Sequence, residues 1–404
     1  MLGKLRGIDK YIHGALIMLS VFGIIMIGSA STGSAAYLGT AYALMNMIKQ
    51  FVFVIIGYLI LRFLIRYFNT KYINDKTLLV LYIMTLLALL ACMFFPEVNG
   101  AKRWIRIGSF LTIQPSEFSK IVIILLLSYF FTEVPKALST IIRFRNLDEK
   151  KKFEKRKMWE CFFKPMLYSL IIVHIALVNQ GDTGTAAIML FIIGVCFLST
   201  NSPYYKKMHF YFFITVFFIL IIGLLVIILV PELLQNALKA YQGARIASWL
   251  DPFSSIQNSS YQIVNGLLSF VKGGFGGVGF ANSTLKYGYI PEAHNDYITA
   301  IISEELGLIG LLLIIIPYCI IIFKLINHAF EIGNSKDKII LMGIASYFFI
   351  HLFLNLGGVS GLIPMTGVPL LCVSSGGSGV LSAYISIGIA QSIIRKNNLN
   401  ATIK

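Results

Sequence analysis

Long uninterrupted runs of apolar residues alternate with shorter polar segments along the whole chain. A helix rises about 1.5 Å per residue, so about 20 residues cross the roughly 30 Å hydrocarbon core of a bilayer. The runs do not alternate with period two, which favours transmembrane helices over a β-barrel. We expect ten spans, at 11–30, 46–66, 77–95, 117–133, 165–180, 183–199, 209–230, 297–323, 339–357 and 375–394.

The composition agrees with this pattern, because 57% of the 404 residues are hydrophobic and only 13% are charged. No polar stretch is long enough to form a sizeable soluble domain. This excludes a cytosolic enzyme and gives no reason to expect a nucleic-acid partner. The chain is therefore predicted to be an all-α polytopic membrane protein, with one transmembrane domain over residues 1–404.

The basic residues are distributed unevenly. With the N-terminus inside, the predicted inner segments hold 25 of the 34 Lys and Arg residues, whereas the 18 acidic residues divide equally between inner segments and the remainder. Cytoplasmic segments of membrane proteins carry such an excess of Lys and Arg. The charge pattern predicts an N-in, C-in topology with an even number of spans.

Two polar segments are longer than ordinary turns. The inner segment 134–164 contains the run EKKKFEKRK, which we interpret as a solvated cytoplasmic loop that touches anionic lipid, with docking of a partner as the alternative. The outer segment 231–296 contains amphipathic stretches at 232–249 and 260–272, as expected for helices in the membrane interface. Such a loop could form one wall of a lipid-facing cleft.

The outer segment also contains Gly274, Gly276 and Gly279, which match the spacing G-x-G-x-x-G. No strand precedes them and no βαβ unit surrounds them, so a dinucleotide site is not indicated. We expect a turn at which the backbone closely approaches a neighbouring segment or a ligand.

Ionisable residues inside spans are costly and call for an explanation. In the stretch QPSEFSK, Pro115 suits the first turn of the fourth span, and Gln114 or Ser116 could cap it. Glu117 and Lys120 lie three residues apart on one helical face and can pair. A structural ion pair and a polar substrate channel are both open interpretations.

Several cations fall on the predicted outer side, against the overall charge trend. Their partners could be anionic headgroups or a pyrophosphate, whose oxygens accept charge-assisted hydrogen bonds. Interfacial snorkelling is the alternative for each one. These residues are Lys102, Arg103, Arg106, Arg245, Lys272 and Lys286. Asp182, in NQGDTGTA, is predicted to cap the sixth span.

The stretch PEAHNDYITAIISEELG places carboxylates at the start of the eighth span. Asp296 follows His294 and Asn295 and a loop with apolar and basic elements, so a partly desolvated cleft could make it a general base. Helix capping is the alternative role. Glu304 and Glu305 lie about 100° apart on the helix, so we expect one to point into the bundle and the other to flank it.

Taken in order, four segments resemble the SEDS family (shape, elongation, division and sporulation), which includes the FtsW, RodA and SpoVE branches. They are NGAKRWIRIGSFLTIQPSEFSK, QGDTGTA, PEAHNDYITAIISEELGLIG and LIPMTGVPLLCVSSGGSG, and they span nearly the whole chain. NGAKRW and PEAH favour the FtsW or SpoVE branch. The late motif and Asn295 depart from the usual family pattern, which leaves the branch open.

The resemblance implies a peptidoglycan glycosyltransferase of the bacterial plasma membrane that polymerises lipid II at the outer face. It implies that Asp296 is the essential outer acid and that Glu117 and Lys120 are the family's buried pair. In that reaction Asp296 would take a proton from a sugar hydroxyl, with cations such as Lys102, Arg103, Arg106 and Lys120 on the pyrophosphate side.

The resemblance also implies partners: lipid II, an undecaprenyl-pyrophosphate-linked glycan, a class B penicillin-binding protein, and other divisome or elongasome membrane proteins. A divalent cation, Mg²⁺ or Mn²⁺, could replace part of the positive charge, with Asp296 as its one clear ligand. Two alternatives stay open: a lipid II flippase without polymerase activity, and a scaffold that recruits the transpeptidase.

Overall fold

The computed structural model describes residues 7–97, 100–107, 111–133, 135, 147–229, 240–253, 260–291 and 293–401. Its main helices are α1 (Lys10–Leu38), α2 (Thr40–Tyr67), α3 (Asp75–Ala91), α4 (Pro115–Phe130), α6 (Leu147–Met158), α7 (Lys164–His174), α8 (Thr183–Leu198), α9 (Lys206–Leu229), α11 (Ala240–Leu250), α12 (Tyr261–Gly273), α13 (Ile298–Glu331), α14 (Ser335–Val359) and α15 (Gly377–Ala401). Two short strands, β1 (Ile105–Ile107) and β2 (Leu111–Ile113), complete it.

Within the described residues, eight helical stretches are long and apolar enough to cross a membrane: Lys10–Ser34, Ala41–Tyr67, Asp75–Phe94, Lys151–Asn179, Lys206–Gly223, Ile298–Glu331, Ser335–Val359 and Gly377–Asn400. The chain is thus a multi-pass membrane protein. The other two predicted spans correspond to α4 and α8, which have only 16 residues each. At about 1.5 Å per residue each is shorter than the roughly 30 Å hydrocarbon core.

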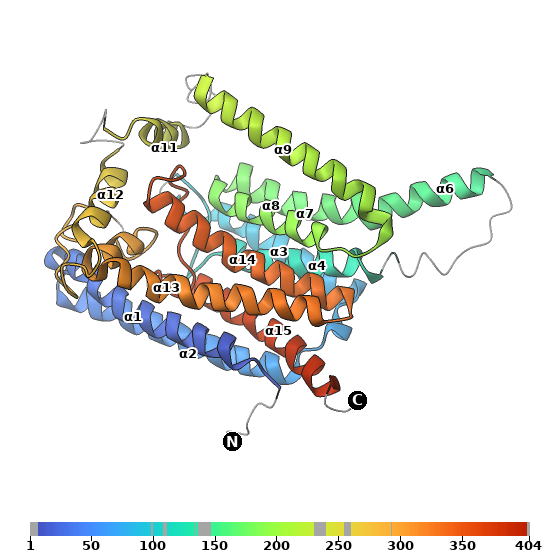
Figure 1. Ribbon diagram of the computed structural model, residues 1–404, viewed down its shortest axis with the longest axis horizontal. Coiled ribbons are helices and arrows are strands. Elements are labelled where there is room, and N and C mark those ends of the chain that lie inside the picture. Colours follow the sequence, from blue (N-terminus) through green and yellow to red (C-terminus); the bar gives the residue numbers. More distant parts are fainter. Residues whose placement is uncertain are drawn as a thin grey trace.

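Most of the long helices pack side by side into one bundle, and α9 lies outside it (Figure 1). The start of α1, the end of α15 and α6 lie at one end of this bundle, whereas α11 and α12 lie at the opposite end. The connection between α1 and α2 and the connection between α12 and α13 lie at the same end of the bundle as α12. The N- and C-terminal segments also touch directly, because Asn398 Nδ2 donates to the Gly7 carbonyl (2.9 Å).

The predicted all-α fold is confirmed, and the structure adds one short strand pair to it. β1 and β2 form an antiparallel pair in which Arg106 stands opposite Thr112. The physical reason is the local pattern: apolar residues at 105, 107, 111 and 113 alternate with polar ones, the period of a strand rather than of a helix.

The predicted inner loop 134–164 is also partly helical. α6 begins at Leu147 and continues through a π-helical turn, Trp159–Phe163, into α7. Acidic residues in the first turn of α6 and basic residues in its last turn match the helix dipole, which explains why this charged run is helical. Residues 134 and 136–146 of the predicted loop lie outside the described residues.

Of the two amphipathic stretches predicted in the outer loop, the one at 260–272 is confirmed as helix α12, and the described part of the one at 232–249 is helix α11. Residues 232–239 lie outside the described residues. The glycine-rich turn behaves as expected, because main-chain hydrogen bonds join residues 274–279 to residues 304–309 of α13. A Cβ on Gly277 would collide with the Glu305 carbonyl, and Gly307 interrupts α13 with φ 61°. The turn therefore uses glycine on both sides of a close backbone contact.

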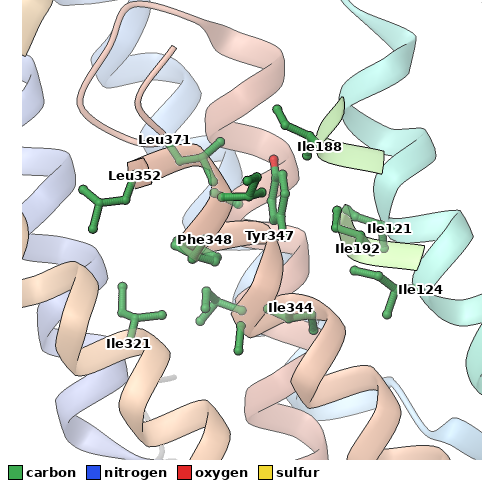
Figure 2. Close-up of a cluster of buried hydrophobic side chains, with 14 of the residues drawn as sticks. Ile121, Ile124, Ile188, Ile192, Ile321, Ile344, Tyr347, Phe348, Leu352 and Leu371 are labelled. Atoms are coloured by element: carbon green, nitrogen blue, oxygen red, sulfur yellow. The ribbon is translucent and has the colours of Figure 1, made fainter. Parts of the chain in front are cut away.

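The core lies where α4, α8, α13 and α14 meet (Figure 2). Tyr347 and Phe348 of α14 point in different directions from one turn, toward Ile121 and Ile192 on one side and toward Ile321 on the other. Both aromatic residues are fully buried. α14 is consequently the central helix, and polar groups placed on it are shielded from lipid.

Candidate active site

Asp296 lies two residues before α13 and is half-buried. Its main-chain carbonyl accepts a hydrogen bond from Asn355 Nδ2 of α14 (2.8 Å). The neighbouring His294 is almost buried, its ring lies edge-on to Tyr42, and its carbonyl accepts from the Ser375 amide (2.9 Å). The main chain around Asp296 is thus held by α14 and by the segment that precedes α15.

We call residues 360–376, between α14 and α15, the 360–376 loop. Gly367 in this loop has φ 68°, a left-handed conformation that favours glycine. A Cβ placed on Gly367 would lie 3.2 Å from Arg245 Nη2 and 3.5 Å from Asp296 Oδ2. The guanidinium and the carboxylate therefore both lie over the same glycine, separated by no more than the sum of these two distances.

Arg245 reaches this position from α11, a helix of the outer loop. Its Nη1 donates to the Met365 carbonyl (3.0 Å), and Trp249, one turn later, donates through Nε1 to the Gly361 carbonyl (2.9 Å). Two side chains on one face of α11 thus bind main-chain carbonyls of the 360–376 loop. The loop is the platform that brings an outer-loop cation to the acid at the start of α13.

A second polar cluster lies around Asp182, close to the same loop. Asp182 caps α8, as predicted, because its carboxylate accepts from the Thr185 amide (3.1 Å) and hydroxyl (2.8 Å). Arg103 pairs with Asp182 (3.3 Å). Gly184, two residues later, packs so closely that a Cβ on it would lie 2.9 Å from the Thr366 carbonyl. Of the three predicted outer cations in this region, Lys102, Arg103 and Arg106, only Arg103 forms this ion pair with Asp182.

Arg103 is tied to a buried carboxylate, whereas Lys102 and Arg106 expose their side chains. Gln114 is the N-cap residue of α4 but makes no side-chain cap; its amide donates to Asp182 instead (3.1 Å). Pro115 occupies the first turn of α4, as predicted.

Glu117 and Lys120 are fully enclosed by the bundle and form the expected pair, with 2.8 Å between Nζ and Oε1. Lys120 Nζ also contacts His351 Nε2 (3.1 Å), and Glu117 Oε2 accepts from the Tyr347 hydroxyl (3.1 Å). A buried charge pair is tolerated only when its remaining hydrogen-bonding capacity is met, as here. This pairing and burial agree with a structural ion pair, and a role in a polar substrate channel stays a prediction.

Lys286 differs from its predicted role as an outer-surface cation. Its side chain is wholly buried, and its ammonium contacts Glu305 (2.9 Å), the Ala281 carbonyl (2.6 Å) and Ser29 (3.3 Å). The reason is that the outer loop folds back onto α13, which the spacing of charges along the chain did not reveal. Lys286 balances a buried carboxylate and has no exposed surface for a headgroup.

Glu304 and Glu305 were expected to point in different directions, but both bind the outer loop. Glu304 accepts from the amides of Thr284 and Leu285 (3.2 Å each), while Glu305 accepts from the Ala281 amide (3.1 Å) and the Ser29 hydroxyl. The interruption of α13 at Gly307 and the close loop contact bring both side chains to segment 281–286. We call Glu304, Glu305 and Lys286 the buried acidic clamp; the exposed Lys272 adds a longer contact with Glu304 (3.7 Å).

Sequence reasoning missed Gly367, Asn355, His351 and Tyr347. The last three stand four residues apart in an apolar span, and polar groups at that depth are themselves a signal. Gly367 has no such signal in the sequence, because its role depends on the Arg245 and Asp296 side chains that pack against it. No group of three or more His, Cys, Asp or Glu that could hold a metal occurs among the residues that the structure describes.

With this geometry in view, the comparisons with known proteins are informative. The family model FTSW_RODA_SPOVE, described as "Cell cycle protein", matches residues 10–399. The chain belongs to this family. The predicted resemblance is thereby confirmed, and it covers nearly all of the chain.

Members of the family with curated names match over almost their full length. The Bacillus subtilis (strain 168) protein named "Probable peptidoglycan glycosyltransferase FtsW" is 31% identical over 394 residues, 96% of this chain and 91% of the relative. The Enterococcus hirae protein of the same name is 32% identical, covering 96% and 93%. "Stage V sporulation protein E" of B. subtilis is 29% identical, covering 94% of each.

Solved structures share the family fold. A chain from "Structural coordination of polymerization and crosslinking by a peptidoglycan synthase complex" matches with a TM-score of 0.71 at 22% identity, covering 97% of this chain and 98% of that one. The rod shape determining protein RodA of Thermus thermophilus matches with a TM-score of 0.61 at 21% identity and the same coverage. At these identities the matches establish the fold.

Proposed function

We propose that this protein is a peptidoglycan glycosyltransferase that polymerises lipid II into glycan strands at the outer face of the bacterial plasma membrane. Its relatives carry that enzyme name across more than nine-tenths of the chain. The observation that carries the proposal is the meeting of the Asp296 carboxylate and the Arg245 guanidinium over Gly367. A base and a phosphate-binding cation are the two groups that this reaction needs.

In the proposed reaction the 4-hydroxyl of the acceptor sugar attacks the anomeric carbon of the lipid-linked chain. A new C–O bond forms as the bond to undecaprenyl pyrophosphate breaks, and the leaving oxygen keeps the electron pair. Asp296 takes the hydroxyl proton, and Arg245 binds the oxygens of the departing diphosphate. The exposed Lys102 and Arg106 add positive charge that attracts the anionic substrate. Arg103 is paired with Asp182, and His294 is two residues from the base in the chain.

The proposed orientation has ten spans with both termini in the cytoplasm. It counts the short helices α4 and α8 as spans. The N-termini of these two helices lie close together, because the side chains of their N-cap residues, Gln114 and Asp182, are hydrogen-bonded. It also agrees with the excess of basic residues in the segments predicted to lie at the end of the bundle where α1 begins and α15 ends (Figure 1). Asp296, α11 and α12 then face the outside.

We propose further that the enzyme works with a class B penicillin-binding protein and other divisome or elongasome membrane proteins. One structural neighbour comes from a complex that couples polymerisation to crosslinking. A divalent cation carried by the diphosphate stays a hypothesis. The described residues offer Asp296 no cluster of further metal ligands, so no step above depends on a protein-held ion.

The decisive experiment supplies purified full-length protein and its transpeptidase partner with lipid II and measures glycan polymer on a gel. Wild type is expected to form polymer, and Asp296→Ala is expected not to. Asp251→Ala, which removes an exposed outer-loop carboxylate just after α11, is the matched control and should retain polymerisation. Normal polymer from Asp296→Ala would refute the role of the base.

The same preparation distinguishes the transporter alternative. Reconstituted into liposomes, the protein alone should not move lipid II between leaflets at a rate above that of protein-free vesicles. Lipid II scrambling without any polymer, with or without the partner, would favour a flippase and overturn the proposed function. EDTA treatment followed by Mg²⁺ or Mn²⁺ addition tests the cation hypothesis in the polymerisation assay.

A further inference from the structure

One face of α14 carries a stripe of buried polar residues. Tyr347, His351 and Asn355 are spaced by four residues, so they stand above one another on the helix. All three are fully buried. The stripe begins at the Glu117 and Lys120 pair and ends at Asp296, and therefore joins the deepest charges of the bundle to the candidate active site.

The direction of each hydrogen bond along the stripe can be assigned. Lys120 has only donors, so Nε2 of His351 accepts from it (3.1 Å). The other ring nitrogen, Nδ1, then carries the hydrogen and donates to the Pro369 carbonyl (3.0 Å). His351 thus anchors the 360–376 loop one turn below Asn355.

Asn355 anchors the same loop and the base together. Its Nδ2 donates both to the Asp296 carbonyl (2.8 Å) and to the Val368 carbonyl (2.9 Å). Its Oδ1 accepts from the Thr299 hydroxyl in the first turn of α13, and this bond sets which end of the amide faces the two carbonyls. One side chain therefore ties the residue that carries the base to the residue that follows Gly367.

This arrangement has a geometric consequence. Asp296 and Arg245 meet over Gly367, and Arg245 is fastened to the 360–376 loop through the Met365 carbonyl. The relative position of base and cation therefore depends on how α13 is held against that loop. The Asn355 side chain bonds both to the Asp296 carbonyl, just before α13, and to the Val368 carbonyl of the 360–376 loop.

We propose that Asn355 is the positioning residue of the active site: its hydrogen bond to the Asp296 main chain holds the Asp296 carboxylate close to the Arg245 guanidinium. Thr299 orients the amide for this task. The proposal rests on the proposed function for its kinetic consequence, but its geometric part can be measured without activity. It goes beyond the base itself, because Asn355 contacts only the main chain of Asp296 and takes no part in proton transfer.

A second buried asparagine provides a matched control. Asn265 of α12 also uses Nδ2 to bind two main-chain carbonyls, those of Tyr261 (2.9 Å) and Tyr289 (3.1 Å). It is buried like Asn355, but both of its carbonyl partners lie within the outer loop. Replacing either asparagine by leucine removes two side-chain hydrogen bonds to main-chain carbonyls, so both variants carry a structural cost.

The test compares Asn355→Leu with Asn265→Leu in the full chain with its partner. We expect Asn355→Leu to lower kcat for lipid II polymerisation by about 100-fold, because a displacement near 1 Å can cost that much, with KM within about threefold of wild type. Asn265→Leu should keep kcat within about threefold of wild type. A structural role alone would lower the active fraction of both variants alike.

Thr299 supplies a gentler pair of variants. Thr299→Val keeps the shape and removes the hydroxyl, and should lower kcat about tenfold, whereas Thr299→Ser keeps the hydroxyl and should restore it. This rescue distinguishes orientation of the Asn355 amide from simple packing. It also keeps the proposal testable if Asn355→Leu does not fold.

Hydrogen–deuterium exchange measures positioning independently of polymerisation. Peptides covering 293–300 and 363–371 should exchange at least about tenfold faster in Asn355→Leu and Thr299→Val than in wild type. Their exchange rates in Asn265→Leu should equal those of wild type. If wild type forms no polymer while exchange rises as expected, the proposed function fails and the positioning stands. Unchanged exchange in Thr299→Val and Asn355→Leu, or equal loss of kcat in Asn265→Leu, would overturn the role of Asn355.

Discussion

Two acidic sites flank the start of α13 and use their carboxylates differently. In the buried acidic clamp, Glu304 and Glu305 are almost inaccessible, and their oxygens accept hydrogen bonds from amides, hydroxyls and the ammonium of Lys286. Asp296, two turns earlier, is half-buried and lies over Gly367 beside Arg245. The clamp holds the outer loop onto the bundle, whereas Asp296 is accessible to a substrate.

The difference teaches that an acid in a membrane span is not by that fact catalytic. A carboxylate that is buried away from any substrate cannot take a proton from it. It does, however, carry a large structural cost if its partner is removed, because a buried charge is left unpaired. The two sites should therefore respond oppositely to the same amide substitution.

The largest expected effect is on activity at Asp296. Asp296→Asn should lower the polymerisation rate by about 10²–10⁴-fold, the usual contribution of a general base, without lowering the melting temperature. Initial rates with lipid II and a thermal unfolding curve check both parts. A variant that loses stability as well as activity would place Asp296 with the clamp residues.

The opposite result is expected at Glu305. Glu305→Gln leaves Lys286 buried without its charge partner and should destabilise the protein by about 3–5 kcal/mol. Thermal unfolding in detergent measures the loss. The double variant Lys286→Met/Glu305→Leu removes both charges and should recover much of it; a double variant no more stable than Glu305→Gln would contradict the clamp as an ion-pair device.

An intermediate effect is expected at Arg245. Arg245→Ala should lower kcat by about 10²-fold, as the loss of a transition-state donor does, and Arg245→Lys should recover only part because the planar fork is lost. Comparison of kcat and KM for the two variants checks this. Equal activity of Arg245→Ala and wild type would separate Arg245 from the diphosphate.

The smallest effect is expected at Lys102, which is exposed and forms no part of the pair over Gly367. Lys102→Ala should slow polymerisation about threefold at low salt and have less effect at high salt, because exposed charges are screened. Rates at several ionic strengths measure this. A salt-independent loss would instead show direct contact with the substrate.

Much of the fold was predictable because it depends on local patterns. The apolar runs matched the long helices, the three-to-four spacing matched α11 and α12, and the Asp182 and Pro115 positions followed from helix-end preferences. The strand pair and the start of α6 were missed, although alternation and the distribution of charge were visible there. The count of ten spans goes beyond the eight helices that meet the length requirement.

The sequence by itself determined that this chain crosses a membrane, which family it belongs to, and that Asp296 stands at a helix start. Only the tertiary structure decided which charges are exposed. Lys286 and Arg245 both fall in the outer segment 231–296, but one is buried against Glu305 and the other lies over Gly367. The physical reason is that burial and pairing depend on contacts between residues far apart in the chain, which local periodicity does not encode.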